Sequence, residues 1–185
     1  MTPLLAGLLA VAVLAAVADW AALSAGGPWG RAVEVVAKPL ATLALLVAAI
    51  AWPVADPVSG AARPWLVLGL AASLAGDALL LPPGRFTAGL AAFLVAHLAY
   101  LGAFLVVGVT CPWLVAGIVA ALVLAGTVGL RLVRLAGRVG LAVPVALYLV
   151  AICVMAAAAT GTGEPAAIAG AWLFVASDAL LGWGR

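Results

Sequence analysis

Apolar residues form seven long runs along the chain, separated by short segments in which proline, glycine and arginine are frequent. A helix that crosses a bilayer needs roughly 20 mainly apolar residues. The first run has no basic residue before it and is longer than a typical signal-peptide core, which favours a spanning helix there too. The pattern predicts membrane-spanning helices over residues 3–23, 32–52, 64–81, 87–107, 113–130, 140–159 and 166–182.

The fold class follows from how evenly the apolar residues are distributed around each run. The strands of a membrane β-barrel alternate polar and apolar residues over about 10 positions, whereas these runs are apolar on every face. Composition agrees, because 69% of the residues are hydrophobic and 8% are charged, against roughly 25% charged in a soluble domain. We therefore expect an all-α polytopic transmembrane bundle of about seven helices, with residues 1–185 forming a single domain.

The distribution of arginines predicts the orientation in the membrane. One side, formed by loops one, three and five and the C-terminus, carries nearly all of them, and Arg63 alone lies on the other side. Since cytoplasmic loops collect basic residues, the C-terminus is expected in the cytoplasm. These arginines set topology, so the net charge of +2 does not indicate a nucleic-acid partner. The chain has no Asn or Gln and prefers Arg to Lys, which indicates GC-rich coding and hence a bacterium. We therefore expect the protein in a bacterial inner membrane. The arginines on the basic side are Arg31, Arg85, Arg131, Arg134, Arg138 and Arg185.

Few ionisable side chains stand inside the apolar runs. Each costs about 2.5–3.5 kcal/mol to insert at the centre of a membrane helix, so each is a candidate for function. The helical rise puts some of them roughly 6–9 Å and others roughly 12–15 Å from the cytoplasmic helix ends. Lys38, Asp77, His97, Tyr148 and Asp178 are expected to converge on one pocket near the cytoplasmic side. The candidates are Asp19, Glu34, Lys38, Asp77, His97, Tyr148 and Asp178.

The sequence Asp-Ala-Leu-Leu occurs twice, beginning at Asp77 and at Asp178. A single Asp near a helix end can simply reach interfacial water, but the repetition favours a shared function. Aligning the two aspartates also pairs Gly69 with Gly170. The chain therefore fits a weak parallel internal repeat of residues 1–107 and 113–185.

Two polar or aromatic stripes follow helical spacing. Glu34, Lys38 and Thr42 share one face of the run 32–52, with Glu34 placed before Lys38 as an i,i+4 ion pair requires. This face either lines a polar cavity or holds a Glu34–Lys38 pair whose lysine snorkels to the headgroups. A second stripe in the run 87–107 either lines a lipid channel or serves ordinary packing. Its members are Phe86, Gly89, Phe93, His97, Tyr100 and Phe104.

Five ordered motifs resemble the YhhN family, which includes the lysoplasmalogenases. They are "KPL" at 38–40, "GDALLLPP" at 76–83, "FTAGLAAFLVAHLAY" at 86–100, Tyr148 with Met155, and "GAWLFVASDALL" at 170–181. The resemblance implies a membrane hydrolase that cleaves the vinyl-ether bond of a lyso-phospholipid in the bilayer, releasing a fatty aldehyde and a glycerophospho-headgroup. It also implies an eighth helix, which family members usually have after the second Asp motif. The family's motif residues map onto Lys38, Asp77, His97, Tyr100, Tyr148, Ser177 and Asp178.

Vinyl-ether hydrolysis requires one acid, one base and no cofactor. Two carboxylates in a shared pocket of low dielectric constant do not both ionise easily, so one holds a proton while the other is anionic. We expect Asp77 and Asp178 to be catalytic, assisted by Lys38 and His97. The sequence does not assign acid and base between the two aspartates. Residues expected to contact the lipid are Tyr100, Tyr148, Ser177, Phe93, Glu34 and Arg85.

Other chemistries fit less well. A zinc hydrolase needs several ligands and the chain has one histidine, so no metal site is expected. No G-x-S-x-G motif supports a serine hydrolase. The alternative function is a proton-coupled transporter, but its coupling groups are expected near the midplane. Cys111 and Cys153 are expected to pack without forming a disulfide. The small-residue ridge of Gly69, Ser73 and Asp77 packs against another helix, either in this chain or in a homodimer.

Overall fold

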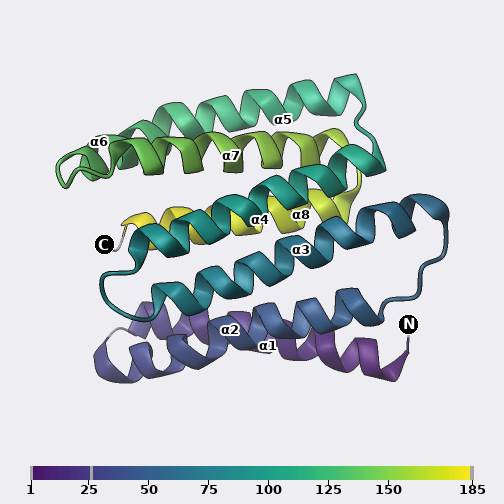
Figure 1. Ribbon diagram of the computed structural model, residues 1–185, viewed down its shortest axis with the longest axis horizontal. Helices are drawn as coiled ribbons and strands as arrows, with labels where there is room; N and C mark the ends of the chain where they lie inside the picture. Colours follow the sequence, from purple (N-terminus) through teal and green to yellow (C-terminus); the bar gives the residue numbers. More distant parts are fainter. Residues whose placement is uncertain (1, 26, 184–185) are drawn as a thin grey trace. The chain divides into compact units, whose positions relative to one another are not determined.

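The structure is a computed structural model that describes residues 2–25 and 27–183. Within these residues the side chains of 23–25, 28, 31, 34 and 180–183 lie outside the description. The described part contains helices and no strand, which confirms the all-α prediction (Figure 1). The helices are α1 (Pro3–Ala25), α2 (Gly27–Ala51), α3 (Pro57–Leu80), α4 (Phe86–Val107), α5 (Cys111–Leu124), a π-helical turn η1 (Ala125–Gly129), α6 (Leu130–Gly137), α7 (Ala142–Gly161) and α8 (Pro165–Trp183).

The seven predicted spans all correspond to helices. Five helical stretches of the described residues are long and apolar enough to cross a membrane, and one of them, Cys111–Gly137, runs without a break through α5, η1 and α6. The apolar parts of α2 and α8 are shorter, at Val35–Ala51 and Pro165–Ala179. The chain is therefore a polytopic helical membrane protein. Its single-domain organisation and internal repeat stay predictions.

The start of α3 was predicted wrongly, seven residues too late. The apolar run begins at Pro64, but the helix begins at Pro57 and continues through Pro64. Asp56 adopts an extended conformation and caps the first turn, and proline is well tolerated at the first helical position. Capping chemistry, which an apolar count does not register, therefore sets this boundary, and Arg63 lies in the helix and not in a loop.

The loop predicted after residue 130 was also wrong. The chain stays helical through α6, so Arg131 and Arg134 are helical residues and Arg138 directly follows the helix. Arginine is a good helix former and lowers hydropathy without ending a helix. All three side chains lie at this end of the span, where they are exposed. The cytoplasmic location of the C-terminus stays a prediction.

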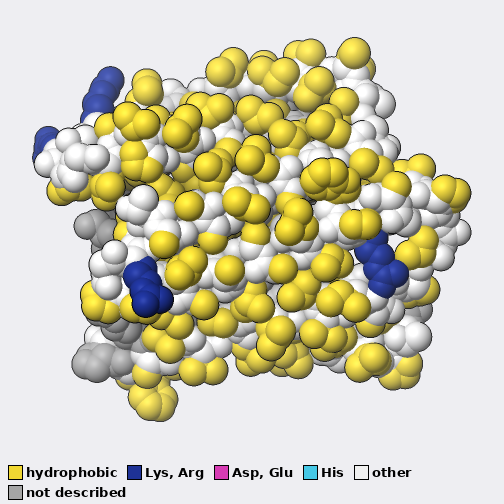
Figure 2. Space-filling model, viewed as in Figure 1, with side chains coloured by type: hydrophobic (Ala, Val, Ile, Leu, Met, Phe, Trp, Pro, Cys, Tyr) yellow, Lys and Arg dark blue, Asp and Glu magenta, His cyan; other side chains and the backbone are white. Residues whose placement is uncertain are grey.

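Apolar side chains cover much of the outer surface, as expected of helices in contact with lipid. On α5 they are spaced three and four residues apart and are all exposed. On the face shown in Figure 2, apolar side chains predominate and Lys and Arg lie toward the ends of helices. We infer that these surfaces contact acyl chains. The exposed stripe on α5 consists of Val115, Ile118, Val119, Leu122 and Val123.

The chain forms two compact units. Unit 1, Met1–Ala96, contains α1 to α3 and the first half of α4, with α1 packed on α2 and α2 on α3. Unit 2, His97–Arg185, contains the rest, with α7 packed against α5, α6 and α8. The backbones of α5 and α7 approach closely at Gly117, where an added Cβ would lie 2.7 Å from the carbonyl oxygen of Ala157. The core of unit 2 is formed by Ile152, Met155, Ala156, Ala159, Ala171 and Val175.

Both cysteines are free thiols. Cys153 is half-buried, and its Sγ lies 3.8 Å from the carbonyl oxygen of Ala121, which agrees with a packing role. Cys111 lies at the start of α5, near a helix end as expected, but it is exposed, so the expectation that it is a packing residue was wrong.

The cap of α3 predicts a local dependence of stability on pH. Asp56 Oδ1 accepts from the Ser59 amide at 2.9 Å and Oδ2 accepts from the Ser59 hydroxyl at 2.6 Å. The side-chain hydrogen bond from Ser59, followed by the backbone one, lowers the pKa of Asp56 below its usual 3.8. Because folding depresses this pKa, the cap's contribution is complete above pH 3.8 and is lost as the pH falls through the folded value.

The corresponding experiment compares wild type with Asp56→Asn, since asparagine also caps helices but does not titrate. Hydrogen–deuterium exchange, corrected for intrinsic rates, should show the first turn of α3 losing protection in acid in wild type only. Equal acid sensitivity in the two proteins would contradict the assignment.

Candidate functional site

In unit 1, a polar cluster forms around Asp77. This carboxylate on α3 is 5% exposed, and its Oδ2 accepts a hydrogen bond of 2.7 Å from the hydroxyl of Thr42 on α2. The same hydroxyl oxygen lies 3.3 Å from the backbone carbonyl oxygen of Lys38, one helical turn earlier. Lys38 on α2 and Asp19 on α1 lie close enough to Asp77 to interact with it electrostatically. Three helices thus bring ionisable groups to one buried position.

Asp19 is the member of this cluster that was absent from the predicted site. It lies on α1 and is 5% exposed. Its sequence signal is an ionisable residue inside an apolar run, but no motif surrounds it and it has no counterpart in the repeated Asp-Ala-Leu-Leu. Only the packing of the helices in unit 1, which brings α1 near Asp77, identifies Asp19 as a member of the cluster.

Close packing of α3 against the first half of α4 fixes the backbone beside Asp77. A Cβ added to Gly76 would lie 2.7 Å from the ring of Phe93, and one added to Gly89 would lie 2.6 Å from Leu80. Because these positions are glycine, the Phe93 ring packs directly on the backbone of α3 and the Leu80 side chain packs directly on the backbone of α4. Phe93, expected to contact the lipid, is itself buried against Gly76.

The hydrogen bond from Thr42 to Asp77 yields a prediction. Thr42→Val preserves the shape of the side chain but removes the donor, and a hydrogen bond to a charged group contributes about 1.5–3 kcal/mol. If Asp77 is catalytic, we expect kcat to fall roughly 10- to 150-fold with the fold retained, and Thr42→Ser, which keeps the hydroxyl, to restore most of it. Unchanged turnover in the valine variant would show that this bond does not hold a catalytic group.

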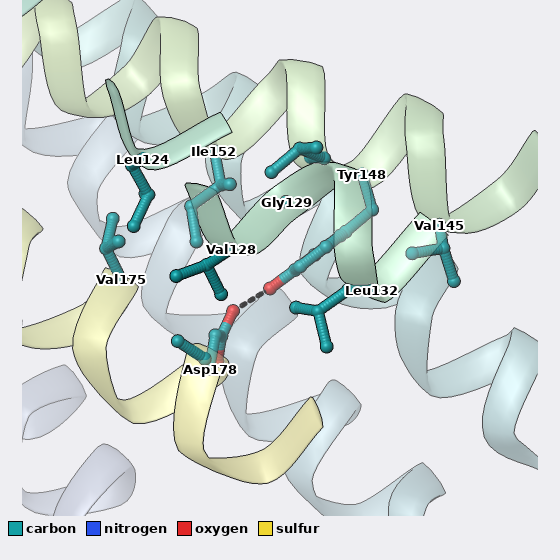
Figure 3. Close-up of a pocket in the computed structure, with 11 residues that line it drawn as sticks. Leu124, Val128, Gly129, Leu132, Val145, Tyr148, Ile152, Val175 and Asp178 are labelled. Atoms are coloured by element: carbon teal, nitrogen blue, oxygen red, sulfur yellow. Dashed lines mark hydrogen bonds between the residues drawn. The ribbon is translucent and has the colours of Figure 1, made fainter. Parts of the chain in front are cut away.

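In unit 2, α7 and α8 bring Tyr148 and Asp178 together. The Tyr148 hydroxyl donates a hydrogen bond to Oδ2 of Asp178, and the two side chains point at each other across the pocket drawn in Figure 3. The pocket has a volume of about 60 Å³. Apart from these two residues it is lined by glycine, alanine and aliphatic side chains from α5, η1, α6, α7 and α8. A carboxyl group with a phenol partner therefore stands at an otherwise apolar cavity.

His97 contacts the aromatic rings of this site. Its ring is fully buried and meets Tyr148 edge to face, with centroids 5.1 Å apart at 88°. The His97 ring also meets the Phe174 ring edge to face, with centroids 5.0 Å apart, and the centroids of the Tyr100 and Phe174 rings are 6.4 Å apart. Such contacts contribute about 0.5–1.5 kcal/mol each beyond burial. His97 thus packs against the ring whose hydroxyl binds Asp178, and its catalytic role stays a prediction.

The remaining predicted lipid contacts are more dispersed. Ser177 is half-buried on α8 and does not line the pocket. Tyr100 is half-buried and packs at the core of unit 2, and Arg85 is exposed between α3 and α4. The side chain of Glu34 lies outside the described residues. Asp77 and Asp178 belong to different units, so their convergence on one substrate also stays a prediction.

Across the described residues, no group of three or more His, Cys, Asp or Glu side chains could hold a metal ion. The functional groups that the structure brings together at the two clusters are carboxylates, hydroxyls, one imidazole and one ammonium group. These groups transfer protons and stabilise charge.

Together these features define a polytopic helical membrane protein with buried carboxylates held by hydroxyl donors. The model of the YhhN family matches residues 33–185, and the chain belongs to this family. No curated protein and no solved structure matches the chain. Asp19 lies before the matched region, whereas Lys38, Asp77, His97, Tyr148 and Asp178 lie within it.

Proposed function

We propose that this protein hydrolyses the vinyl-ether bond of a lyso-ether phospholipid in the bilayer, giving a fatty aldehyde and a glycerophospho-headgroup. Membership of the YhhN family supports a hydrolase of this class. The observation that carries the proposal is the Tyr148–Asp178 pair in an otherwise apolar pocket. A proton donor or acceptor beside an apolar cavity is what an enol ether on an aliphatic chain requires.

The reaction begins with protonation of a carbon of the double bond and continues with the addition of water. One carboxyl group, Asp77 or Asp178, donates a proton to the chain carbon C2, and the double-bond electrons form the new C–H bond. The cation left on C1 and the ether oxygen is stabilised by the second carboxylate, as in glycosidases. Water adds to C1 while that carboxylate takes its proton, giving a hemiacetal. The hemiacetal loses its hydroxyl proton, the C1–O bond breaks, and the glycerol oxygen takes a proton.

The other residues support this chemistry. We propose that Thr42 and Lys38 position Asp77 and that Tyr148, oriented by His97, positions Asp178. Arg85, exposed between α3 and α4, is suited to the lipid phosphate. We propose a bacterial inner membrane with a cytoplasmic C-terminus, because the loop with Arg85 and the arginines near α6 are expected to lie on the basic, cytoplasmic side.

The test is aldehyde release by the purified protein in detergent. A lysoplasmalogen should yield aldehyde, while the matched lipid with a saturated alkyl ether should yield none. In D₂O the aldehyde should carry one deuterium at C2, because that carbon receives its proton from an exchangeable acid. Absence of release, or an aldehyde without deuterium at C2 when aldehyde exchange is controlled, would overturn the proposal.

A further inference from the structure

We propose that the pocket at Tyr148 and Asp178 binds the first carbons of the alkenyl chain, those beyond the ether-linked double bond, and so selects lipids that are unbranched at this point. The inference rests on the proposed function and adds the part of the substrate that the pocket recognises. It assigns a specificity role to residues that carry no chemistry themselves, chiefly Val128 and Leu132.

The lining of the pocket combines one polar pair with an aliphatic wall. Among the side chains that the structure describes there, the polar ones are the bonded pair Tyr148 and Asp178, and the rest of the wall is apolar, including Val128, Ile152 and Val175. An apolar cavity stays dry and accepts apolar ligands. Hydrocarbon is therefore favoured along the aliphatic wall, and a group able to exchange a proton is favoured next to Tyr148 and Asp178.

The size of the pocket limits what enters it. One water molecule needs roughly 10–15 Å³ of such space, and an apolar cavity of about 150 Å³ holds benzene. With about 60 Å³, this pocket admits a short run of carbons and not a whole lipid chain. The remainder of the chain would extend along the exposed apolar surface. A methyl branch next to the double bond would compete for this limited space.

The π-helical turn η1 forms part of the pocket wall near Asp178. Thr127 donates its hydroxyl to the carbonyl oxygen of Val123 at 2.7 Å, and Val128 and Gly129 from the same turn line the pocket. Leu149 fills the space at Gly129, where a Cβ would lie 2.5 Å from its Cδ2. Single π-turns inside α-helices are frequent at functional sites. Here the turn directs Val128 toward the pocket that holds the carboxyl group (Figure 3).

The reaction itself fixes which carbons lie in the pocket. If Asp178 serves as acid or base, C1 and C2 of the chain must lie within hydrogen-bond reach of its carboxyl group. The next carbon, C3, is then one bond away and falls among Val128, Leu132 and Ile152, which line the same cavity. The ether oxygen and the glycerophospho-headgroup beyond it then face away from the aliphatic wall.

The experiment uses a lipid that binds without reacting. A 1-O-alkyl lysophosphatidylethanolamine with a photoreactive diazirine at C4 is irradiated with the purified protein, and the labelled peptides are mapped. We expect labelling of η1, α6 and α7 at the pocket, reduced about tenfold by Val128→Phe. Val123→Phe is the matched control, because Val123 is 61% exposed on the preceding turn. It should leave the labelling unchanged.

Turnover supplies a second readout that distinguishes the two proposals. Wild type should prefer a straight vinyl ether to one with a methyl branch at C3 by about tenfold in kcat/KM, and Val128→Ala should reduce that preference. Pocket labelling without any aldehyde release would overturn the proposed function alone. Aldehyde release with labelling outside the pocket, or with a branch preference unchanged in Val128→Ala, would overturn this inference alone.

Discussion

Replacing Asp178 by Asn should reduce aldehyde release by about 10²–10⁴-fold while the protein remains folded. The substitution preserves the size of the side chain but removes a group that gains and loses protons, and general acid–base catalysis contributes a factor of this order. The amide can still interact with the Tyr148 hydroxyl, so the contact between α7 and α8 is retained. The measurement is kcat in detergent, together with the elution profile and helical content of the variant.

Tyr148→Phe is the companion variant. It keeps the ring that packs against His97 but removes the hydroxyl that donates to Asp178. A hydrogen bond to a charged group contributes about 1.5–3 kcal/mol, so a loss of roughly 10- to 150-fold is expected, smaller than that of Asp178→Asn. A larger loss in the phenylalanine variant, or full activity in the asparagine variant, would contradict a catalytic Asp178.

Replacing Gly117 by Val should strongly destabilise unit 2. A Cβ at Gly117 would lie 2.7 Å from the carbonyl oxygen and 2.9 Å from the Cα of Ala157, and 2.8 Å from the Cβ of Thr160. Two of these atoms are backbone, so α5 and α7 must separate. Overpacking typically costs about 1–3 kcal/mol, and the larger valine should reach or exceed the upper end.

Gly170→Ala is the matched control, because Gly170 lies on α8 of the same unit and has no atom within 4 Å of an added Cβ. Alanine there should leave stability unchanged or raise it by up to about 1 kcal/mol, the difference in helix propensity. The readout is the midpoint of thermal aggregation in detergent. Equal midpoints for Gly117→Val and wild type would show that α5 and α7 do not pack as described.

The helical fold was predictable because burial in a membrane determines the length and hydropathy of each segment. Runs of about 20 apolar residues identify spans whatever their packing, and each predicted run is a helix. The misplaced boundaries have local causes that hydropathy does not contain. Asp56 and Pro57 start α3 before its apolar run, and the arginines of α6 continue a helix that the hydropathy count ended at Leu130.

The site was predictable only as a set of residue types. Charge inside a span identified Lys38, Asp77, His97 and Asp178, and the structure adds how two of them are held: Thr42 donates to Asp77 and Tyr148 to Asp178. The contribution of Asp19 and the pocket at the π-turn depend on which helix faces meet. Helical periodicity within one segment does not determine this, because apolar residues occur on every face of these helices.

The most direct measurement of the central claim is aldehyde release from a lysoplasmalogen by wild type, Asp77→Asn, Asp178→Asn and the double variant, each shown to be folded. If the two carboxyl groups act in one reaction, each single variant loses most activity and the double variant is little worse than the poorer single one. Full activity in either single variant, or losses that simply multiply in the double variant, would contradict a paired-aspartate mechanism.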